Sequence, residues 1–265
     1  MDEKPAESGA AVEAMIDSRR APNYPEPPTT PADPASSASG AGLVLQRPAK
    51  RDRSLGHWLW YHSVRYLCGT LSTVIFPWRA TGHGHLPDSG GLFLVSNHLS
   101  FIDVFFIGIP LRRHLNYMAR STLFMPILGT AMRSVGGFPI QREGIGASGV
   151  KETLRRVRQG GIVTLFPEGT RSHDGQLGLI KPGIATLVSR ANVPVVPVGL
   201  AGTFEVWPRS CLLPVPHPVR IHYGKPILPD ELDGMDTSAV TELIRNRLEE
   251  CRREAERALR NDISS

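Results

Sequence analysis

The sequence predicts an α/β domain in which helices cover a largely parallel central sheet. After Pro87, short apolar runs alternate with longer segments of helical periodicity, as expected when strands and helices follow one another along the chain. Several of the runs, such as 91–96 and 162–166, are apolar at nearly every position, which is typical of strands buried on both faces. The 265 residues show no internal repeat, so one domain of this kind is expected.

The first 50 residues differ in composition from the rest. They contain eight prolines, and most of the others are Ala, Ser, Gly or charged residues. Such a segment cannot bury enough apolar surface to offset the conformational entropy that ordering would cost. Residues 1–50 are therefore predicted to be a disordered tail.

Residues 55–78 form the first large apolar stretch and are predicted to be a helix. One side of this helix is largely aromatic and aliphatic, the other carries His62, Arg65 and Ser72, and arginines flank both ends. Its longest part without charge or histidine, Tyr66–Trp78, is short beside the roughly 20 residues that cross a bilayer. Region 51–80 is therefore interpreted as an amphipathic helix in the membrane interface. A full or partial membrane span and an ordinary core helix stay open as alternatives.

Residues 81–265 are predicted to form the domain itself. The expected strands are 91–96, 115–119, 135–140, 162–166, 195–200 and 219–223, and the expected helices are 101–109, 123–133, 148–159, 183–190 and a last helix capped by Asp236. In an open sheet of this kind, binding sites collect at the carboxyl ends of strands. Polar motifs that follow a strand directly are therefore the candidates for a site.

The charge of the chain indicates what kind of partner it binds. The whole chain has a formal net charge of +5, and seven acidic and five basic side chains give its first 50 residues −2, so the remainder carries +7. This excess suits a membrane surface or a phosphorylated substrate. No Lys/Arg-rich block with interleaved aromatic residues occurs, so nucleic acid is not an expected partner. The three cysteines are odd in number and far apart, which is typical of a reducing compartment.

The stretch Asn97-His98-Leu-Ser-Phe-Ile-Asp103 follows a predicted strand. One interpretation is structural: Ser100 caps the next helix and Asp103 reaches back to it, as in a capping box. The other is catalytic: the carboxylate of Asp103 orients the His98 ring and stabilises its charged form, so that the other ring nitrogen accepts a proton from a hydroxyl group. The residues of this stretch alone leave both interpretations open.

The stretch Phe166-Pro-Glu-Gly-Thr-Arg171 comes at the end of another predicted strand. Its Glu168 and Arg171 are compatible with a structural ion pair in a turn. They are also compatible with a site in which backbone N–H groups and Arg171 bind phosphate while Glu168 orients an acceptor. Arg142 and Lys181 are expected near other strand ends or helix starts and would add positive charge to the same face.

Taken together, these motifs resemble the lysophosphatidic acid acyltransferase family of glycerolipid acyltransferases. Four sequence blocks of that family occur here in order: Asn97–Asp103, Gly136–Arg142, Phe166–Ser172 and Val193–Val198. The resemblance extends from about Gly82 to Gly224 and covers most of the predicted domain. The first and third blocks are the specific ones.

The resemblance implies an acyl transfer from an acyl thioester to a glycerol hydroxyl. His98 would be the general base and Asp103 the residue that holds its ring, without a covalent acyl-enzyme. The implied substrate-binding residues are Arg142, Glu168, Gly169, Thr170, Arg171 and Lys181. No metal or other cofactor is expected, and acyl-CoA or acyl carrier protein would be the co-substrate.

The expected reaction is acylation of the sn-2 hydroxyl of 1-acylglycerol 3-phosphate, which forms phosphatidic acid in phospholipid biosynthesis. The same chemistry on another lyso-lipid or on glycerol 3-phosphate is an alternative, and a non-catalytic membrane-binding protein of this fold is another. The expected location is the cytoplasmic face of a membrane, as a peripheral or monotopic protein. Five residues could line an acyl tunnel or simply pack in the core: Phe101, Phe105, Phe106, Phe124 and Met125.

Overall fold

The computed structural model describes residues 55–140 and 146–264. The predicted disorder of residues 1–50 lies outside the described residues, and so does the predicted site residue Arg142.

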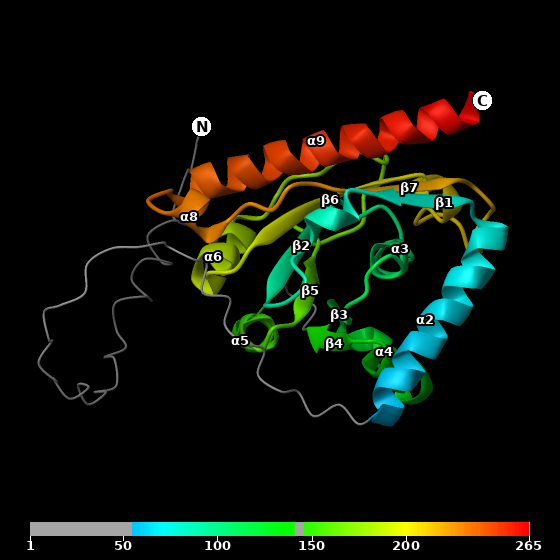
Figure 1. Ribbon diagram of the computed structural model, residues 1–265, viewed down its shortest axis with the longest axis horizontal. Helices are drawn as coiled ribbons and strands as arrows, with labels where there is room; N and C mark the ends of the chain where they lie inside the picture. The colour runs from blue at the N-terminus through cyan, green and yellow to red at the C-terminus, as the bar shows by residue number, and fades with distance from the viewer. Residues whose placement is uncertain (1–54, 141–145, 265) are drawn as a thin grey trace, which may run out of the picture. The chain divides into compact units, whose positions relative to one another are not determined.

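A seven-stranded sheet forms the centre of the described part of the chain (Figure 1). Its strands are β1 (Trp78–Thr81), β2 (Leu92–Ser96), β3 (Leu115–Arg120), β4 (Gly137–Ile140), β5 (Ile162–Leu165), β6 (Val195–Ala201) and β7 (Val219–Tyr223). Their order across the sheet is β1-β7-β6-β2-β5-β3-β4. Only β6 and β7 pair in antiparallel fashion within it, so the predicted α/β class with a largely parallel sheet is confirmed.

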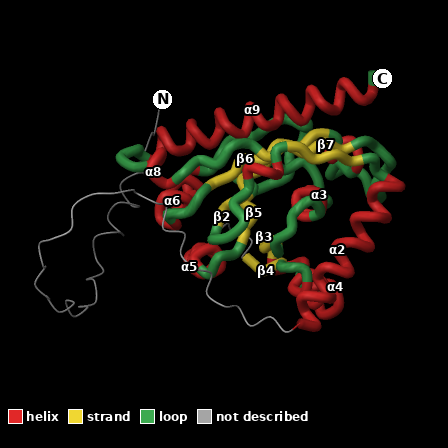
Figure 2. Tube along the Cα trace, in the orientation of Figure 1, coloured by secondary structure: helices red, strands yellow, loops and turns green. Residues whose placement is uncertain are grey.

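Helices pack on both faces of the sheet (Figure 2). They are α2 (Leu55–Ile75), α3 (Asp103–Gly108), α4 (Pro126–Ser134), α5 (Ala147–Arg158), α6 (Pro182–Ala191), α7 (Thr203–Val206), α8 (Pro229–Leu232) and α9 (Thr237–Ile263), with 3-10 turns at His83–His85 and Ser121–Leu123. Successive strand residues point to opposite faces, so Phe93 and Val95 pack with α5, α6 and α9, whereas Leu92 and Leu94 pack with α3. The long helix α9 lies along β6 and β7, and Asp236 caps its first turn as predicted.

The first helix is shorter than predicted. The prediction that Trp78 belongs to this helix is wrong: the helix ends at Ile75, and Trp78 begins β1. Pro77 has no N–H for a helical hydrogen bond, and Trp78 pairs instead with Val219 of β7. The predicted boundary at residue 80 therefore falls inside a strand of the sheet. β1 is an edge strand of four residues without an apolar run of its own, so the sequence pattern does not predict it.

Helix α2 turns its polar side toward the domain. Arg65 donates from Nη1 to the carbonyl oxygens of Ile109 and Leu111, at 2.8 and 2.7 Å. Ser72 is buried, and the Tyr61 hydroxyl accepts from the N–H of Leu115 at 3.2 Å. The exposed side carries mostly apolar side chains, namely Leu55, Trp58, Leu59, Trp60, Tyr66, Leu67, Leu71, Val74 and Ile75. Within the described ranges, no helix combines the length and the apolar character needed to cross a bilayer.

The two specific motifs end neighbouring strands. β2 lies in the middle of the sheet, and β5 is its parallel neighbour, with Val95 paired to Leu165. Because parallel strands end at the same edge, the residues after Ser96 and those after Leu165 meet there. The sheet thus places the His98 and Arg171 segments together, as the positions of their motifs predicted.

Candidate active site

Asn97 fixes the end of β2. Its side chain donates from Nδ2 to the carbonyl of Leu200 at 3.0 Å and accepts from the N–H of Leu200 at 2.9 Å. The backbone pairing of β2 with β6 ends one residue earlier, at Ser96, so the amide side chain extends the ladder by one step. The residues around Asn97 predict no role for it, because its partner Leu200 lies 103 residues away. The buried amide holds the following residue, His98, at a fixed place on the sheet edge.

His98 and Asp103 form the predicted pair. His98 Nδ1 lies 2.7 Å from Asp103 Oδ2, and the same oxygen accepts from the backbone N–H groups of Leu99 and Ser100 at 2.7 and 2.8 Å. Asp103 is fully buried, while the His98 ring is partly exposed and stacks on Phe166 with 3.9 Å between centroids. A carboxylate at Nδ1 favours the tautomer with the proton there, which leaves Nε2 as an acceptor.

The capping interpretation of the same stretch is only half right. Asp103 does reach back to the N–H of Ser100, as a capping box requires. The Ser100 hydroxyl, however, donates to the carbonyl of Trp207 at 2.8 Å, and α3 has no side-chain cap at its start. Ser100 therefore ties the segment to the chain that follows α7 instead of capping the helix.

Glu168 supports the His98 backbone and does not line the cavity described below. Its Oε1 accepts from the N–H of His98 at 2.8 Å, and its Oε2 accepts from the N–H of Gly178 at 2.9 Å. Burial raises the pKa of Glu168, and the two backbone N–H groups partly oppose this rise. Both oxygens of Glu168 thus bind main-chain donors, and its predicted contact with an acceptor stays a prediction.

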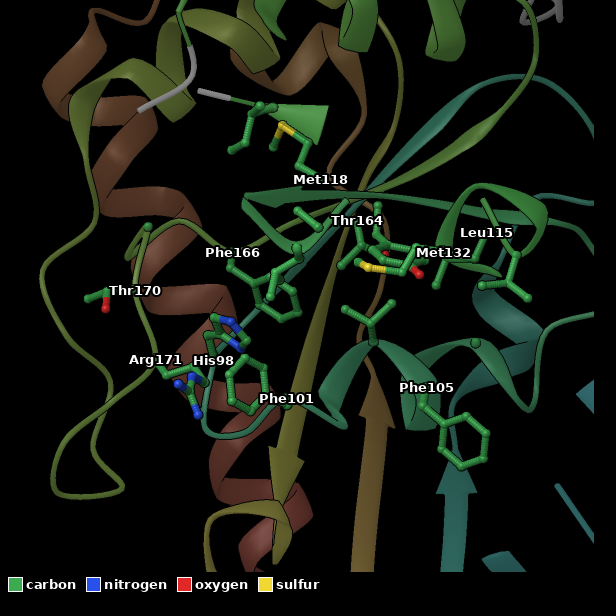
Figure 3. A pocket seen from close by; sticks show the side chains of 18 of the residues that line it. His98, Phe101, Phe105, Leu115, Met118, Met132, Thr164, Phe166, Thr170 and Arg171 are labelled. Carbon is green, nitrogen blue, oxygen red and sulfur yellow. The ribbon is translucent and has the colours of Figure 1, made fainter. Parts of the chain in front are cut away.

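The predicted residues Gly169, Thr170, Arg171 and Lys181 line a cavity beside His98, and the exposure of Gly169, Thr170 and Lys181 marks this end as its mouth. Gly169 has φ +69°, and a Cβ there would lie 2.6 Å from Lys181 Nζ, so the glycine leaves room for the lysine side chain. The Arg171 guanidinium lies 3.5 Å from the centre of the Phe101 ring. Thr170 is another lining residue, and Figure 3 shows it on the loop next to Arg171.

Arg209 is a further cation at this mouth that sequence analysis missed. Its Nη1 lies 3.3 Å from Thr170 Oγ1, 3.4 Å from the Arg171 carbonyl and 2.9 Å from His173 Nε2. It follows α7 in a stretch without a recognisable motif, and only the fold brings it beside the Phe166–Ser172 block. The mouth therefore holds Arg171, Lys181 and Arg209.

A cavity of about 850 Å³ begins at this mouth. Its lining extends from His98 along α3 and β3 to Val64 and Arg65 of α2. Most of the wall is apolar, and Figure 3 shows Phe166 and Thr164 between His98 and Met118. Of the five predicted tunnel candidates, Phe101 and Phe105 line the cavity, Phe106 is buried in the core, and Phe124 and Met125 do not contribute to the lining.

Comparison with known proteins shows which family contains these motifs. Residues 78–201, which contain β1 to β6 with both motifs, match the family model described as Acyltransferase. The chain therefore carries an acyltransferase domain over residues 78–201, just under half of its length. The resemblance inferred from the four sequence blocks is thereby confirmed.

Several relatives of this chain are 1-acyl-sn-glycerol-3-phosphate acyltransferases. A chloroplastic one from Brassica napus is 33% identical over 181 residues, covering 65% of this chain and 52% of that protein. One from Arabidopsis thaliana is 32% identical, covering 68% and 52%, and one from Bacillus subtilis is 29% identical over 120 residues, covering 44% and 59%. The chain spans about half the length of the plant proteins it matches.

A solved structure shares the fold of this acyltransferase. The crystal structure of the 1-acyl-sn-glycerophosphate acyltransferase PlsC from Thermotoga maritima superimposes with a TM-score of 0.64 at 22% identity, covering 76% of this chain and 83% of that one. In the described part of the acyltransferase, no three His, Cys, Asp or Glu side chains group closely enough to hold a metal ion.

Proposed function

We propose that this acyltransferase moves a fatty acyl chain from an acyl thioester to the sn-2 hydroxyl of 1-acylglycerol 3-phosphate, forming phosphatidic acid. The observation that carries the proposal is the His98–Asp103 pair at the point where three cations and an apolar cavity meet. The printed names of the relatives support the same acceptor.

His98 acts as the general base. Its Nε2 takes the proton of the acceptor hydroxyl as the oxygen attacks the thioester carbonyl, and Asp103 stabilises the imidazolium that forms. The carbon–sulfur bond then breaks, and the imidazolium returns its proton to the leaving thiolate. The products are an ester and a free thiol, and no step requires a metal or a redox cofactor.

The cations at the mouth bind the phosphate of the acceptor. Arg171 offers a planar guanidinium held on the Phe101 ring, and Lys181 and Arg209 add charge on the same side. A phosphate between them places the glycerol hydroxyl beside His98. Arg142 is proposed as another phosphate contact from the Gly136–Arg142 block.

The apolar cavity takes an acyl chain. An alkyl chain loses water-exposed surface on entering it, and each buried methylene contributes about 0.8 kcal/mol. The cavity starts at His98, so a chain inside it leaves its carboxyl end at the base. The acyl donor carries its acyl group on coenzyme A or on acyl carrier protein.

Helix α2 attaches the enzyme to the membrane interface. A helix that packs its polar side on a domain and exposes an apolar side is the reverse of an ordinary surface helix. Insertion of Trp58, Leu67, Leu71 and Val74 into lipid removes this apolar surface from water. We place the enzyme on the cytoplasmic face as a peripheral or monotopic protein, in keeping with the free thiol of Cys211.

An acyl-transfer assay across a panel of acceptors tests the proposal. Purified protein receives an acyl thioester with 1-acylglycerol 3-phosphate, with other lysophospholipids, with glycerol 3-phosphate and with monoacylglycerol. We expect turnover to be highest on 1-acylglycerol 3-phosphate and to fall about 10²–10⁴-fold in His98→Ala. Turnover only on acceptors without phosphate contradicts the assigned substrate, and unchanged turnover of His98→Ala contradicts the mechanism.

A further inference from the structure

The loop between α7 and β7, residues 208–218, exposes an apolar tip. Leu212 and Leu213 are 87% and 72% exposed, and Val215 is 51% exposed. Between Trp207 and Val219 the sequence contains no acidic residue, and its charged or titratable groups are Arg209, Cys211 and His217. Leucines with this exposure gain nothing from the fold of the domain itself.

The 208–218 loop is held in shape by internal hydrogen bonds. Trp207 donates from its indole nitrogen to the carbonyl of Cys211 at 3.0 Å, and the N–H of Val215 donates to the carbonyl of Val206 at 2.8 Å. Four prolines at positions 208, 214, 216 and 218 restrict φ as well. Because the backbone is already ordered, a binding partner for the tip has little conformational entropy to remove.

One end of this loop lies at the mouth of the cavity. Trp207 packs edge-on against Phe101 with 5.8 Å between ring centroids, and its carbonyl accepts from Ser100. Arg209, two residues further on, lines the mouth and contacts Thr170.

The other end of the 208–218 loop lies beside the segment that follows the C-terminus of α2. The N–H of Val219 donates to the carbonyl of Pro77 at 3.0 Å, directly after the helix. The last turns of α2 expose Leu71, Val74 and Ile75. The loop therefore runs from the mouth of the cavity to the segment that directly follows α2.

We infer that the tip of the 208–218 loop inserts into an anionic lipid surface as a second membrane contact and holds the mouth of the cavity against the bilayer. This inference rests on the proposed function, since it supplies the path by which a lyso-lipid leaves the bilayer for His98. The charge favours an anionic lipid: Arg209 at the base of the loop and Arg171 and Lys181 beside it face lipid phosphates, with no acidic side chain in the loop to repel them.

Vesicle binding of the full chain tests the inference. The protein is mixed with phosphatidylcholine vesicles with and without phosphatidylglycerol, and the bound fraction is measured by sedimentation. Leu212→Ser/Leu213→Ser is expected to lower the partition coefficient about tenfold, because two inserted leucines are lost. Leu213→Trp is expected to raise it, since Trp favours the interface. Met235→Ser, an exposed apolar residue in the turn before α9, is the control and should leave binding unchanged.

Activity separates this inference from the proposed function. In the Leu212→Ser/Leu213→Ser variant, turnover of 1-acylglycerol 3-phosphate held in vesicles should fall, while turnover of a short-chain acceptor dissolved as monomers should stay at the wild-type level. Equal vesicle binding and equal vesicle turnover in this variant and in the wild type overturn the inference and leave the acyl transfer intact. A wild-type chain that is dimeric in solution, with a monomeric double variant that still binds vesicles, also overturns it, because the tip is then a contact between copies. Absence of turnover in the wild type on both acceptors contradicts the proposed function instead.

Discussion

At the scale of single residues, the position of His98 depends on groups from several segments. Asp103 holds the ring, Phe166 supports its face, and Glu168 holds its main-chain N–H. The carboxylate of Glu168 also binds Gly178, so it joins the β2 and β5 loops to the chain ahead of α6. We therefore regard Glu168 as a positioning residue for His98.

Glu168→Gln tests this role. An amide has one oxygen where the two main-chain N–H groups need two acceptor atoms, so one of them loses its partner and the His98 segment shifts. We expect kcat to fall at least about tenfold with a smaller change in the KM for the acceptor, because the loss affects the base and not the binding of phosphate. Glu242→Gln on the exposed side of α9 is the control. A large rise in KM at unchanged kcat would mean that Glu168 contacts the acceptor directly.

At the scale of elements, the site depends on how β2 is tied to its neighbours. Asn97 replaces a backbone step between β2 and β6, and both of its hydrogen bonds are buried. A second, purely local group of hydrogen bonds lies on α5, where Glu152 accepts from Arg155 and Arg156 of the same helix. The first stabilises a contact between segments distant in sequence, and the second stabilises the helix itself.

Asn97→Ala is expected to destabilise the protein. It leaves the N–H and the carbonyl of Leu200 without partners in a buried place, at a cost of about 2–4 kcal/mol for the two groups. Urea unfolding should show a lower midpoint at an unchanged slope. Asn246→Ala, on an exposed position of α9, should be close to wild type. Equal stability of Asn97→Ala and the wild type would show that the amide bonds contribute nothing net.

The lowered pKa of Glu152 predicts that the stability of the fold depends on pH. The side-chain hydrogen bond from Arg155, with a further one from Arg156, lowers the pKa of Glu152 from 4.5 to about 2. A pKa that is lower in the folded state contributes stability above pH 4.5 and loses it as pH falls toward 2. Because the pair is partly exposed, we expect a contribution of only about 0.5–1 kcal/mol.

Thermal unfolding of the Glu152→Gln variant tests the pH-dependent contribution of Glu152 to stability. The variant should melt below the wild type at pH 7, and the difference should shrink as pH falls from 4.5 to 2. Glu250→Gln, whose carboxylate is exposed and 3.9 Å from Arg247, serves as the comparison and should show little difference at any pH. A constant difference for Glu152→Gln at all pH values would contradict the electrostatic origin.

At the scale of the whole molecule, the cavity connects parts that the sequence separates. α2 closes its far end, and Arg65 fastens α2 to the chain after α3. His98 and Val64 both line this cavity, one from the end of β2 and the other from α2. Under the proposed function, the separation of His98 from Val64 limits the length of the acyl chain that fits.

Val64→Trp should shift the preference of the enzyme to shorter acyl chains. The larger side chain fills the end of the cavity next to α2, so a long chain can no longer place its carboxyl end at His98. We expect kcat/KM for long-chain substrates to fall by tenfold or more, about 1.4 kcal/mol, while short chains keep their rates. Met235→Trp, at an exposed position that lies outside both α2 and the cavity lining, is the control. An equal loss for all chain lengths would indicate that the variant only disturbs packing.

The sequence predicted most strands and helices within a few residues. The predictions were wrong where the local sequence pattern was weak or was compatible with two structures. β1 is a short edge strand whose first residue, Trp78, ends an apolar stretch, so the pattern predicts helix at that residue. Ser100 has the side chain of a cap, but the carbonyl of Trp207 binds it instead. In both cases a partner more than 100 residues away decided the outcome.

The sequence by itself determined the α/β class, the placement of His98 and Arg171 after strand ends and of Asp103 at the start of a helix, and the positive charge of the domain. These follow from periodicity and from residue type, which are local properties. Only the tertiary structure decided that Glu168 binds main-chain N–H groups, that Arg209 joins the mouth, and that α2 turns its polar side inward. The physical reason is that a buried polar group must find a partner, and close packing of distant segments determines which partner is within reach.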